Sequence, residues 1–441
     1  MAKASRLSSE CGAMLVQVAI AILTLSTFTI LVYDNGALWL ARSQAQNAAD
    51  AGALAGAVAR SFDEIVHPVA ADGFARNAAV KAAEANKDLR GITAVVGEPQ
   101  FDWGGLPCPP GIGGKCARVD VFADSAHGNP LPTLFGNLLA ITSQNVRATA
   151  TARTAIGTAT NCLKPWGIAD KWVEKRTPTA VRDAPWQLTE TFEKWVMKGG
   201  NAGDPYAQPH DIYAPPTTTG TGTGFTPGKD LGLQLVLDPV SDNGNIDAFP
   251  GGFFVKLDLP CAQGGGGDCY RSNISGCNGI SYSIGDVVNL DNNPGTKVGP
   301  TEQGVGDLVA LDPNATWVKD NPGSVWVPDQ PQPGRVGGSA YGTSPRTVPI
   351  AMMDINDYLE FGKNGKTSIR IANLIGFFVE GTCTTVPNAK LEAQSFNACK
   401  GNHAKAKIVG RLTKAPGLMI STAPAPITPE SSFLSVIQLV R

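Results

Sequence analysis

The longest apolar run in the chain lies near its N-terminus and predicts one membrane-spanning helix. Between Glu10 and Asp34 the sequence CGAMLVQVAIAILTLSTFTILVY contains no charged residue. A helix needs about 20 such residues to cross a hydrocarbon core of about 30 Å. We therefore assign the span to residues 13–33. The alternative is a cleaved signal peptide, which has a shorter apolar core and a small-residue cleavage site.

The charges that flank this run predict its orientation. Lys3, Arg6 and the terminal amine precede it against a single Glu10, whereas Asp34 follows it. Because positive flanks stay in the cytoplasm, residues 1–12 are expected to form a cytoplasmic tail. The expected location is the bacterial cytoplasmic (inner) membrane, crossed once, with membrane lipid as a partner and the C-terminal region periplasmic or extracellular.

The helical pattern continues beyond the apolar run. Residues 34–60 lack proline and are rich in alanine, so the same helix is expected to run on. Within them, Gly52 and Gly56 form a small-xxx-small pair, which allows a second helix to approach closely. The alternative is that this face packs on its own domain. Residues 72–88 predict a second helix.

Runs with alternating or continuous apolar positions predict strands in the rest of the chain. A small antiparallel sheet that ends with residues 145–156 completes a first domain, residues 34–156. Residues 157–441 contain recurrent apolar runs between turns rich in Gly, Pro, Asn and Asp, which is typical of a sandwich or barrel. Within this second domain we expect a short helix at residues 191–197 and a flexible loop at residues 215–228. The predicted fold class is α+β, with a β-rich extracytoplasmic domain.

Nine cysteines add a constraint on the exported part. Cys11 begins the apolar run, and the other eight form an even set without any C-x2-C spacing, which favours disulfides over a zinc site. Locality pairs the cysteines at 108 with 116 and at 383 with 399, and a glycine-rich loop pairs those at 261 and 269. The expected disulfides are Cys108–Cys116, Cys162–Cys277, Cys261–Cys269 and Cys383–Cys399. The alternative joins 269 to 277 and 162 to 261.

Composition and motifs point away from catalysis. The net charge of −2 offers no basic surface for nucleic acid. The chain has four scattered histidines and no nucleophile elbow, P-loop or H-E-x-x-H motif, so we expect neither an enzyme, a cofactor nor a small-molecule substrate. The histidines are expected at the surface, and the acidic pair in MMDINDYLE is expected to cap a helix and lie on a solvated face rather than act as paired carboxylates. These residues are His67, His127, His210, His403, Asp354 and Asp357.

One oxygen-rich segment has the alternate spacing of a calcium loop, although turns rich in Asp and Asn share that composition. Its weak candidate ligands are Asp286, Asn289, Asp291 and Asn293.

The most distinctive segment follows the apolar run and reads QNAADAGALAGA. With the basic residues and apolar helix before it, this segment resembles the start of TadG-like proteins of the tight-adherence (Tad/Flp) pilus-assembly family, over roughly residues 10–155. The resemblance implies a pilin-like helix and partners among other pilus-assembly proteins of the membrane and envelope. The helix-packing residues that it marks are Gln46, Asn47, Ala48, Ala49, Asp50, Gly52 and Gly56.

The sequence departs from related families at two points. Pseudopilins have a glutamate five residues after the glycine of their peptidase site, whereas Gln17 stands at that distance from Gly12. Some TadG-like proteins also have a metal-binding D-x-S-x-S motif, which this sequence lacks.

The leading hypothesis is a non-enzymatic membrane-anchored component of pilus assembly. The alternatives are an anchored or released adhesin, which would bind a surface or glycan through residues 157–441, and an exported hydrolase with an unrecognised site.

We predict that Gln17 prevents efficient cleavage by a prepilin peptidase after Gly12, because the expected carboxylate is missing. Mass spectrometry of the mature N-terminus checks this prediction, and a chain that begins at Ala13 would contradict it.

Overall fold

The computed structural model describes residues 4–63, 73–89, 91–102, 108, 115–170, 174–175, 183–184, 191–193, 224–240, 248–250, 252–261, 265–291, 297–319, 334–354, 368–386, 399, 404–418 and 431–440. The chain forms two compact units. Unit 1 comprises residues 1–57, 68–153 and 438–441, and unit 2 comprises residues 58–67 and 154–437. Most of the expected flexible loop, up to residue 223, lies outside the described residues.

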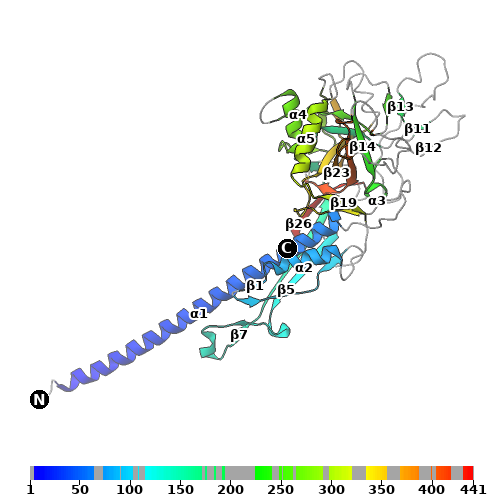
Figure 1. Cartoon of the computed structure of the whole chain (residues 1–441). Coiled ribbons are helices and arrows are strands. Elements are labelled where there is room, and N and C mark those ends of the chain that lie inside the picture. Colours follow the sequence, from blue (N-terminus) through cyan, green and yellow to red (C-terminus); the bar gives the residue numbers. More distant parts are fainter. Residues whose placement is uncertain are drawn as a thin grey trace, which may run out of the picture. The chain divides into compact units, whose positions relative to one another are not determined.

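A single helix, α1 (Ala4–Val58), runs for 55 residues without interruption (Figure 1). It confirms the prediction that the apolar helix continues past Asp34. The sequence allows this length because it contains no proline, and because alanine predominates where the apolar run has ended. A π-helical turn (Ala59–Asp63) follows directly.

The second helix, α2 (Phe74–Glu84), buries three alanines four residues apart, Ala75, Ala79 and Ala83. It is shorter than the expected helix at residues 72–88, because Asp88 belongs to a strand. Strand β1 (Asp88–Leu89) pairs antiparallel with β2 (Ile92–Thr93). Gly91 adopts a positive φ of 83° in the turn between them, a conformation that glycine reaches without strain.

The small antiparallel sheet of unit 1 is centred on β5 (Lys115–Ala123). Strands β3 (Val95–Val96) and β4 (Gln100–Asp102) both pair antiparallel with β5. Strand β8 (Val146–Ile156) is the other neighbour of β5. The long connection from β5 to β8 holds two 3-10 turns, Ser125–His127 and Gly136–Leu139, and a short hairpin of β6 (Leu131–Pro132) and β7 (Ser143–Gln144).

Unit 2 is built on a closed six-stranded barrel, in agreement with the predicted β-rich domain. Most neighbouring strands are antiparallel, but β10 and β21 are parallel, as are β14 and β16. In order around the barrel the strands are β10 (Trp166–Ala169), β16 (Phe253–Lys256), β14 (Gln234–Pro239), β24 (Ile408–Thr413), β23 (Asn373–Thr382) and β21 (Thr347–Met353).

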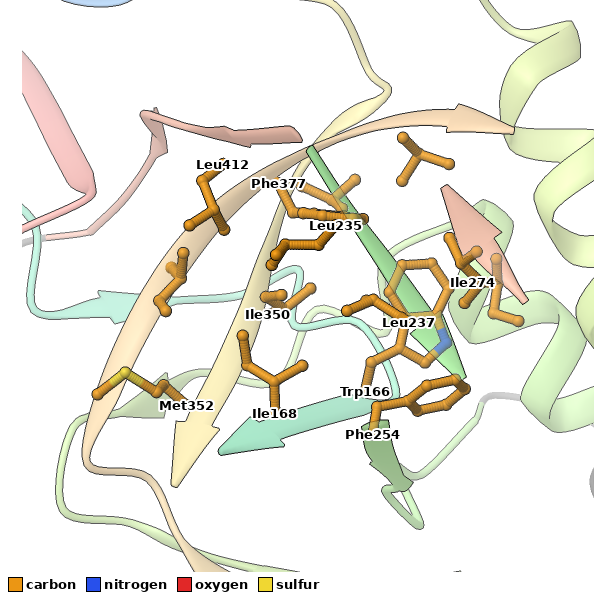
Figure 2. Close-up of a cluster of buried hydrophobic side chains, with 14 of the residues drawn as sticks. Trp166, Ile168, Leu235, Leu237, Phe254, Ile274, Ile350, Met352, Phe377 and Leu412 are labelled. Carbon is orange, nitrogen blue, oxygen red and sulfur yellow. The ribbon is translucent and has the colours of Figure 1, made fainter. Parts of the chain in front are cut away.

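The barrel strands are buried on both faces, which explains their continuous apolar runs. Along β21, Ile350 and Met352 join one apolar cluster, whereas Ala351 and Met353 join another. Figure 2 shows the first cluster, in which Trp166 and Phe254 contact each other edge to face with ring centroids 6.4 Å apart. Successive residues of a strand therefore contribute to two different cores.

Two helices of unit 2 lie side by side, α4 (Gly266–Ser275) and α5 (Val298–Ala310) (Figure 1). Ile274 of α4 and Leu308 of α5 join the first barrel cluster, so the helices cover part of that face. Helix α3 (Pro227–Asp230) is a single short turn. Four pairs of short antiparallel strands are β9 (Ala159–Thr160) with β17 (Tyr282–Ser283), β18 (Val287–Asn289) with β22 (Ser368–Arg370), β19 (Thr316–Lys319) with β20 (Gly334–Gly337), and β11 (Glu174–Lys175) with β12 (Asp183–Ala184). Strand β25 (Ala415–Pro416) pairs parallel with the longer β26 (Leu434–Val440).

The expected helix at residues 191–197 is wrong for the part that the structure describes. Residues Thr191–Glu193 form strand β13 and pair antiparallel with β15 (Ala248–Pro250). Threonine and phenylalanine favour strands, and a partner strand distant in the sequence is available.

The structure contains the four disulfides that the sequence analysis expected: Cys108–Cys116, Cys162–Cys277, Cys261–Cys269 and Cys383–Cys399. The pair with the longest sequence separation, 115 residues, has its Cα atoms 4.5 Å apart. It links the segment before β10 to the residue that follows the C-cap of α4. In the chain-entropy model a loop of about 115 residues is worth roughly 4–5 kcal/mol of stability.

Candidate functional site: the N-terminal helix and its contacts

The first half of α1 exposes its apolar side chains. Every residue from 12 to 29 is exposed. In the part of the chain that the structure describes, one helix is long and apolar enough to cross a membrane, with a best 18-residue window of mean hydropathy 2.3 of which nothing is buried. Unit 1 therefore folds without covering this surface, which is free to contact an apolar environment.

Three threonines in this half form hydrogen bonds within the helix. Thr24 donates from its hydroxyl to the carbonyl of Ile20 at 2.8 Å, and Thr29 donates likewise to Leu25 at 2.8 Å. Thr27 makes the same bond one turn back, at 2.7 Å. Since no hydroxyl among these three needs water, the threonines do not oppose burial of the helix in lipid.

The apolar run ends at Asp34, and this carboxylate binds a distant segment of unit 1. It accepts backbone N–H bonds from Leu134 at 3.1 Å, Phe135 at 3.2 Å and Gly136 at 2.7 Å. Next to it, the Tyr33 and Phe135 rings meet edge to face with centroids 5.5 Å apart. We call residues 133–142 the exit loop, because it is attached to α1 where the charge-free stretch ends.

The second half of α1 is packed by a stripe of small residues. Gly52 lies so close to α2 that an added Cβ would stand 3.0 Å from both the Ala79 carbonyl oxygen and the Ala83 Cβ. An added Cβ at Gly56 would stand 3.0 Å from the Ala79 Cβ. The stripe recurs every three or four residues and comprises Ala41, Ala45, Ala48, Ala49, Gly52, Ala53, Gly56 and Ala57.

Gly52 and Gly56, two of the packing residues expected from the sequence, thus face the interior of unit 1. Of the two alternatives for the glycine pair, the structure has the one in which it packs on its own domain. Ala48 and Ala49 are buried as well, whereas Asn47 is exposed.

Gln46 connects α1 to the sheet. Its amide donates to the Asp50 carboxylate at 2.8 Å and to the Thr149 carbonyl at 3.3 Å. The hydroxyl of Thr149 in turn donates to Asp120, which Arg118 and Arg147 also contact at 3.3 and 3.4 Å. Burial acts to raise the pKa of Asp120, but the Thr149 bond and the Arg118 charge outweigh it and lower that pKa. The carboxylate therefore stays ionised and holds β5 to β8.

Two of the weak calcium candidates, Asp286 and Asp291, have partners within the protein. Asp286 accepts a bond from the Ser283 backbone N–H at 2.6 Å, as in an ordinary turn. Asp291 is buried and forms an ion pair with Lys297, while Asn289 is exposed. Asn293 lies outside the described residues. Among the residues that the structure describes, no group of three or more His, Cys, Asp and Glu side chains is arranged to hold a metal.

His127 has a structural environment. Asp124 caps a 3-10 turn by accepting the His127 backbone N–H at 2.9 Å, and it contacts the ring Nδ1 at 2.6 Å. The ring stacks on Phe122 with centroids 4.3 Å apart. The bond to His127 lowers the pKa of Asp124. The expected solvated face is wrong for Asp354, which is buried directly after strand β21. His67, His210, His403 and Asp357 lie outside the described residues.

Residues 12–59 match the family model of putative Flp pilus-assembly TadE/G-like proteins. We call residues 12–59 the Tad segment, because this is the part of the chain that is similar to that family. The Tad segment coincides with α1 almost from end to end, so it includes both the exposed apolar half and the packed small-residue stripe. No curated protein and no solved structure matches the chain.

We predict that Gly52→Val destabilises the packing of α2 on the Tad segment by about 1–3 kcal/mol, because the added side chain meets backbone and Cβ atoms of α2. Gly36→Val is the matched control in the same helix, since a Cβ there meets nothing within 4 Å. Hydrogen exchange of the α2 amides measures both variants in the full chain. Equal effects of the two substitutions would contradict this account.

Proposed function

We propose that this protein is a non-enzymatic component of Tad/Flp-type pilus assembly that is anchored in the cytoplasmic membrane by residues 13–33. The strongest support is that the Tad segment lies almost entirely in α1, a helix whose first half is exposed and apolar and whose second half is packed in unit 1. Its residues 12–29 are apolar and exposed, whereas the stripe from Ala41 to Ala57 is packed in unit 1. An apolar half without protein cover is what a membrane anchor needs.

The cysteines support the orientation with the N-terminus in the cytoplasm. All eight cysteines that form disulfides follow the proposed span, and the remaining one, Cys11, precedes residue 13. Disulfides persist in the oxidising periplasm and are rare in the reducing cytoplasm. This distribution agrees with the basic residues Lys3 and Arg6 on the N-terminal side.

The buried charges of unit 2 support a structural rather than a catalytic part. Arg346 is buried, and its guanidinium donates to the carbonyls of Ala315 at 2.7 Å, Val379 at 2.9 Å and Glu380 at 3.0 Å. Arg411 donates to the Glu380 carboxylate at 2.8 Å. The bonds of Arg346 tie Ala315, which precedes β19, to Val379 and Glu380 of β23 in the barrel, so this buried charge supports the fold.

We expect the anchor to be required for pilus formation in the bacterium that encodes this protein. Deletion of the gene should abolish surface pili seen by electron microscopy, and the full chain should restore them. A version in which a cleavable signal sequence replaces residues 1–33 should export the same units without restoring pili, because they would no longer be held at the membrane.

Immunoblots of the periplasmic and membrane fractions control for the amount of protein in each strain. Normal pili in the deletion strain would contradict the role in assembly. Normal pili with the released version would contradict the need for the anchor.

A further inference from the structure

The exit loop is an exposed and uncharged surface of unit 1. Leu134, Phe135 and Ile141 are 56%, 40% and 49% exposed. From Asp124 to Arg147 the intervening sequence contains no Asp, Glu, Lys or Arg. Charged residues make up 17% of the whole chain, so an ordinary water-facing loop of this length would be expected to include some. The composition is that of a surface that avoids bulk water.

This apolar surface is continuous with the apolar surface of α1. The Phe135 ring contacts Tyr33, the last residue before the first charge that follows the apolar run. Val32 and Tyr33 are themselves exposed, as is Trp39 one to two turns further along the helix. The three N–H bonds to Asp34 fix the loop at this level.

Several backbone groups of the exit loop form hydrogen bonds within the protein and so do not need water as a partner. Besides the donors that Asp34 accepts, Thr133 N–H bonds the Thr142 carbonyl at 3.2 Å, and Ile141 N–H bonds the Gly136 carbonyl at 2.9 Å. Ala140 N–H reaches the Asn137 carbonyl at 3.2 Å, and the Thr133 hydroxyl bonds the Ile141 carbonyl. Satisfied backbone groups reduce the free-energy cost of moving a loop from water into lipid.

We propose that the exit loop inserts Leu134, Phe135 and Ile141 into the lipid interface of the outer leaflet, beside the point where α1 leaves the bilayer. This inference rests on the proposed anchoring of residues 13–33. Lipid is the occupant because the loop is tied to the end of the apolar span, at the depth where Tyr33 and Trp39 also favour the interface. The contact gives unit 1 a second attachment and sets the rotation of α1 about its own axis.

The test measures the depth of single fluorescent labels in nanodiscs that each hold one chain. Leu134→Cys and Ile141→Cys are made in a Cys11→Ser background, labelled with an environment-sensitive dye, and exposed to lipids with a doxyl quencher near the headgroup; a second sample with the quencher near the end of the acyl chain serves the label at 23. Leu23→Cys is the control within the proposed span. Ala85→Cys is the control at the C-cap of α2, a helix that packs at Gly52, about 27 Å along α1 from Asp34.

We expect the labels at positions 134 and 141 to be quenched several-fold more than the label at 85, together with strong quenching at 23. Quenching at 23 but only background quenching at 134 and 141 would overturn the insertion of the loop and leave the anchor intact. Background quenching at 23 would overturn the anchor and the inference together. The same label at 134 is also measured in vesicles that hold several chains. If its dye reports an apolar environment there but not in the single-chain nanodiscs, the loop contacts a second copy of the chain and the lipid assignment is wrong.

A further substitution tests the positioning role of Asp34. Asp34→Ala removes the acceptor of three N–H bonds, so the label at 134 should lose most of its quenching, whereas the label at 23 should keep its own. Unchanged quenching at 134 would contradict the assignment of Asp34 as the residue that holds the loop at the interface.

Discussion

One uninterrupted helix has to satisfy two environments, and the rest of the structure depends on how it does so. The first half of α1 offers large apolar side chains to its surroundings, whereas the second half turns alanine and glycine towards α2 and the sheet. Large apolar side chains suit the first half to an apolar environment, whereas small side chains let another helix backbone approach the second half closely. The change takes place around Asp34, the first charged residue after the apolar run. Its carboxylate accepts hydrogen bonds from three backbone N–H groups of the exit loop.

Different interactions stabilise the two compact units: close packing of small residues in unit 1, and apolar clusters with buried hydrogen bonds in unit 2. In unit 1, Gly52 and Gly56 let α2 approach until no Cβ would fit at either position without a shift. In unit 2, barrel strands with apolar residues on both faces build two clusters, and Arg346 satisfies the carbonyls of the segments around them. Four disulfides add covalent constraints in both units, and such bonds persist in oxidising compartments.

The sequence predicted most of what local pattern controls. The charge-free run, the lack of proline up to residue 60 and the runs of β21 and β23 led to the long helix and the β-rich domain, and cysteine spacing led to the disulfides. The sequence placed the end of α2 too late, because Asp88 pairs with β2 as part of β1. It missed strand β13 because the partner strand, β15, is distant in the sequence. The attachment of the exit loop to Asp34 joins residues 100 apart. Its only signal in the sequence was an uncharged stretch from 125 to 146.

The central claim is that α1 passes from the proposed span into unit 1 as one rigid helix. Electron spin resonance between labels at Ser26→Cys and Ser43→Cys, in a Cys11→Ser chain held in nanodiscs, tests it most directly, because both serines are exposed and lie on either side of Asp34. On a continuous helix the two backbone positions are about 26 Å apart along the axis. A single narrow distance distribution near that value is expected. A broad distribution, or one centred at clearly shorter distances, would mean a hinge at the membrane exit and would contradict the account.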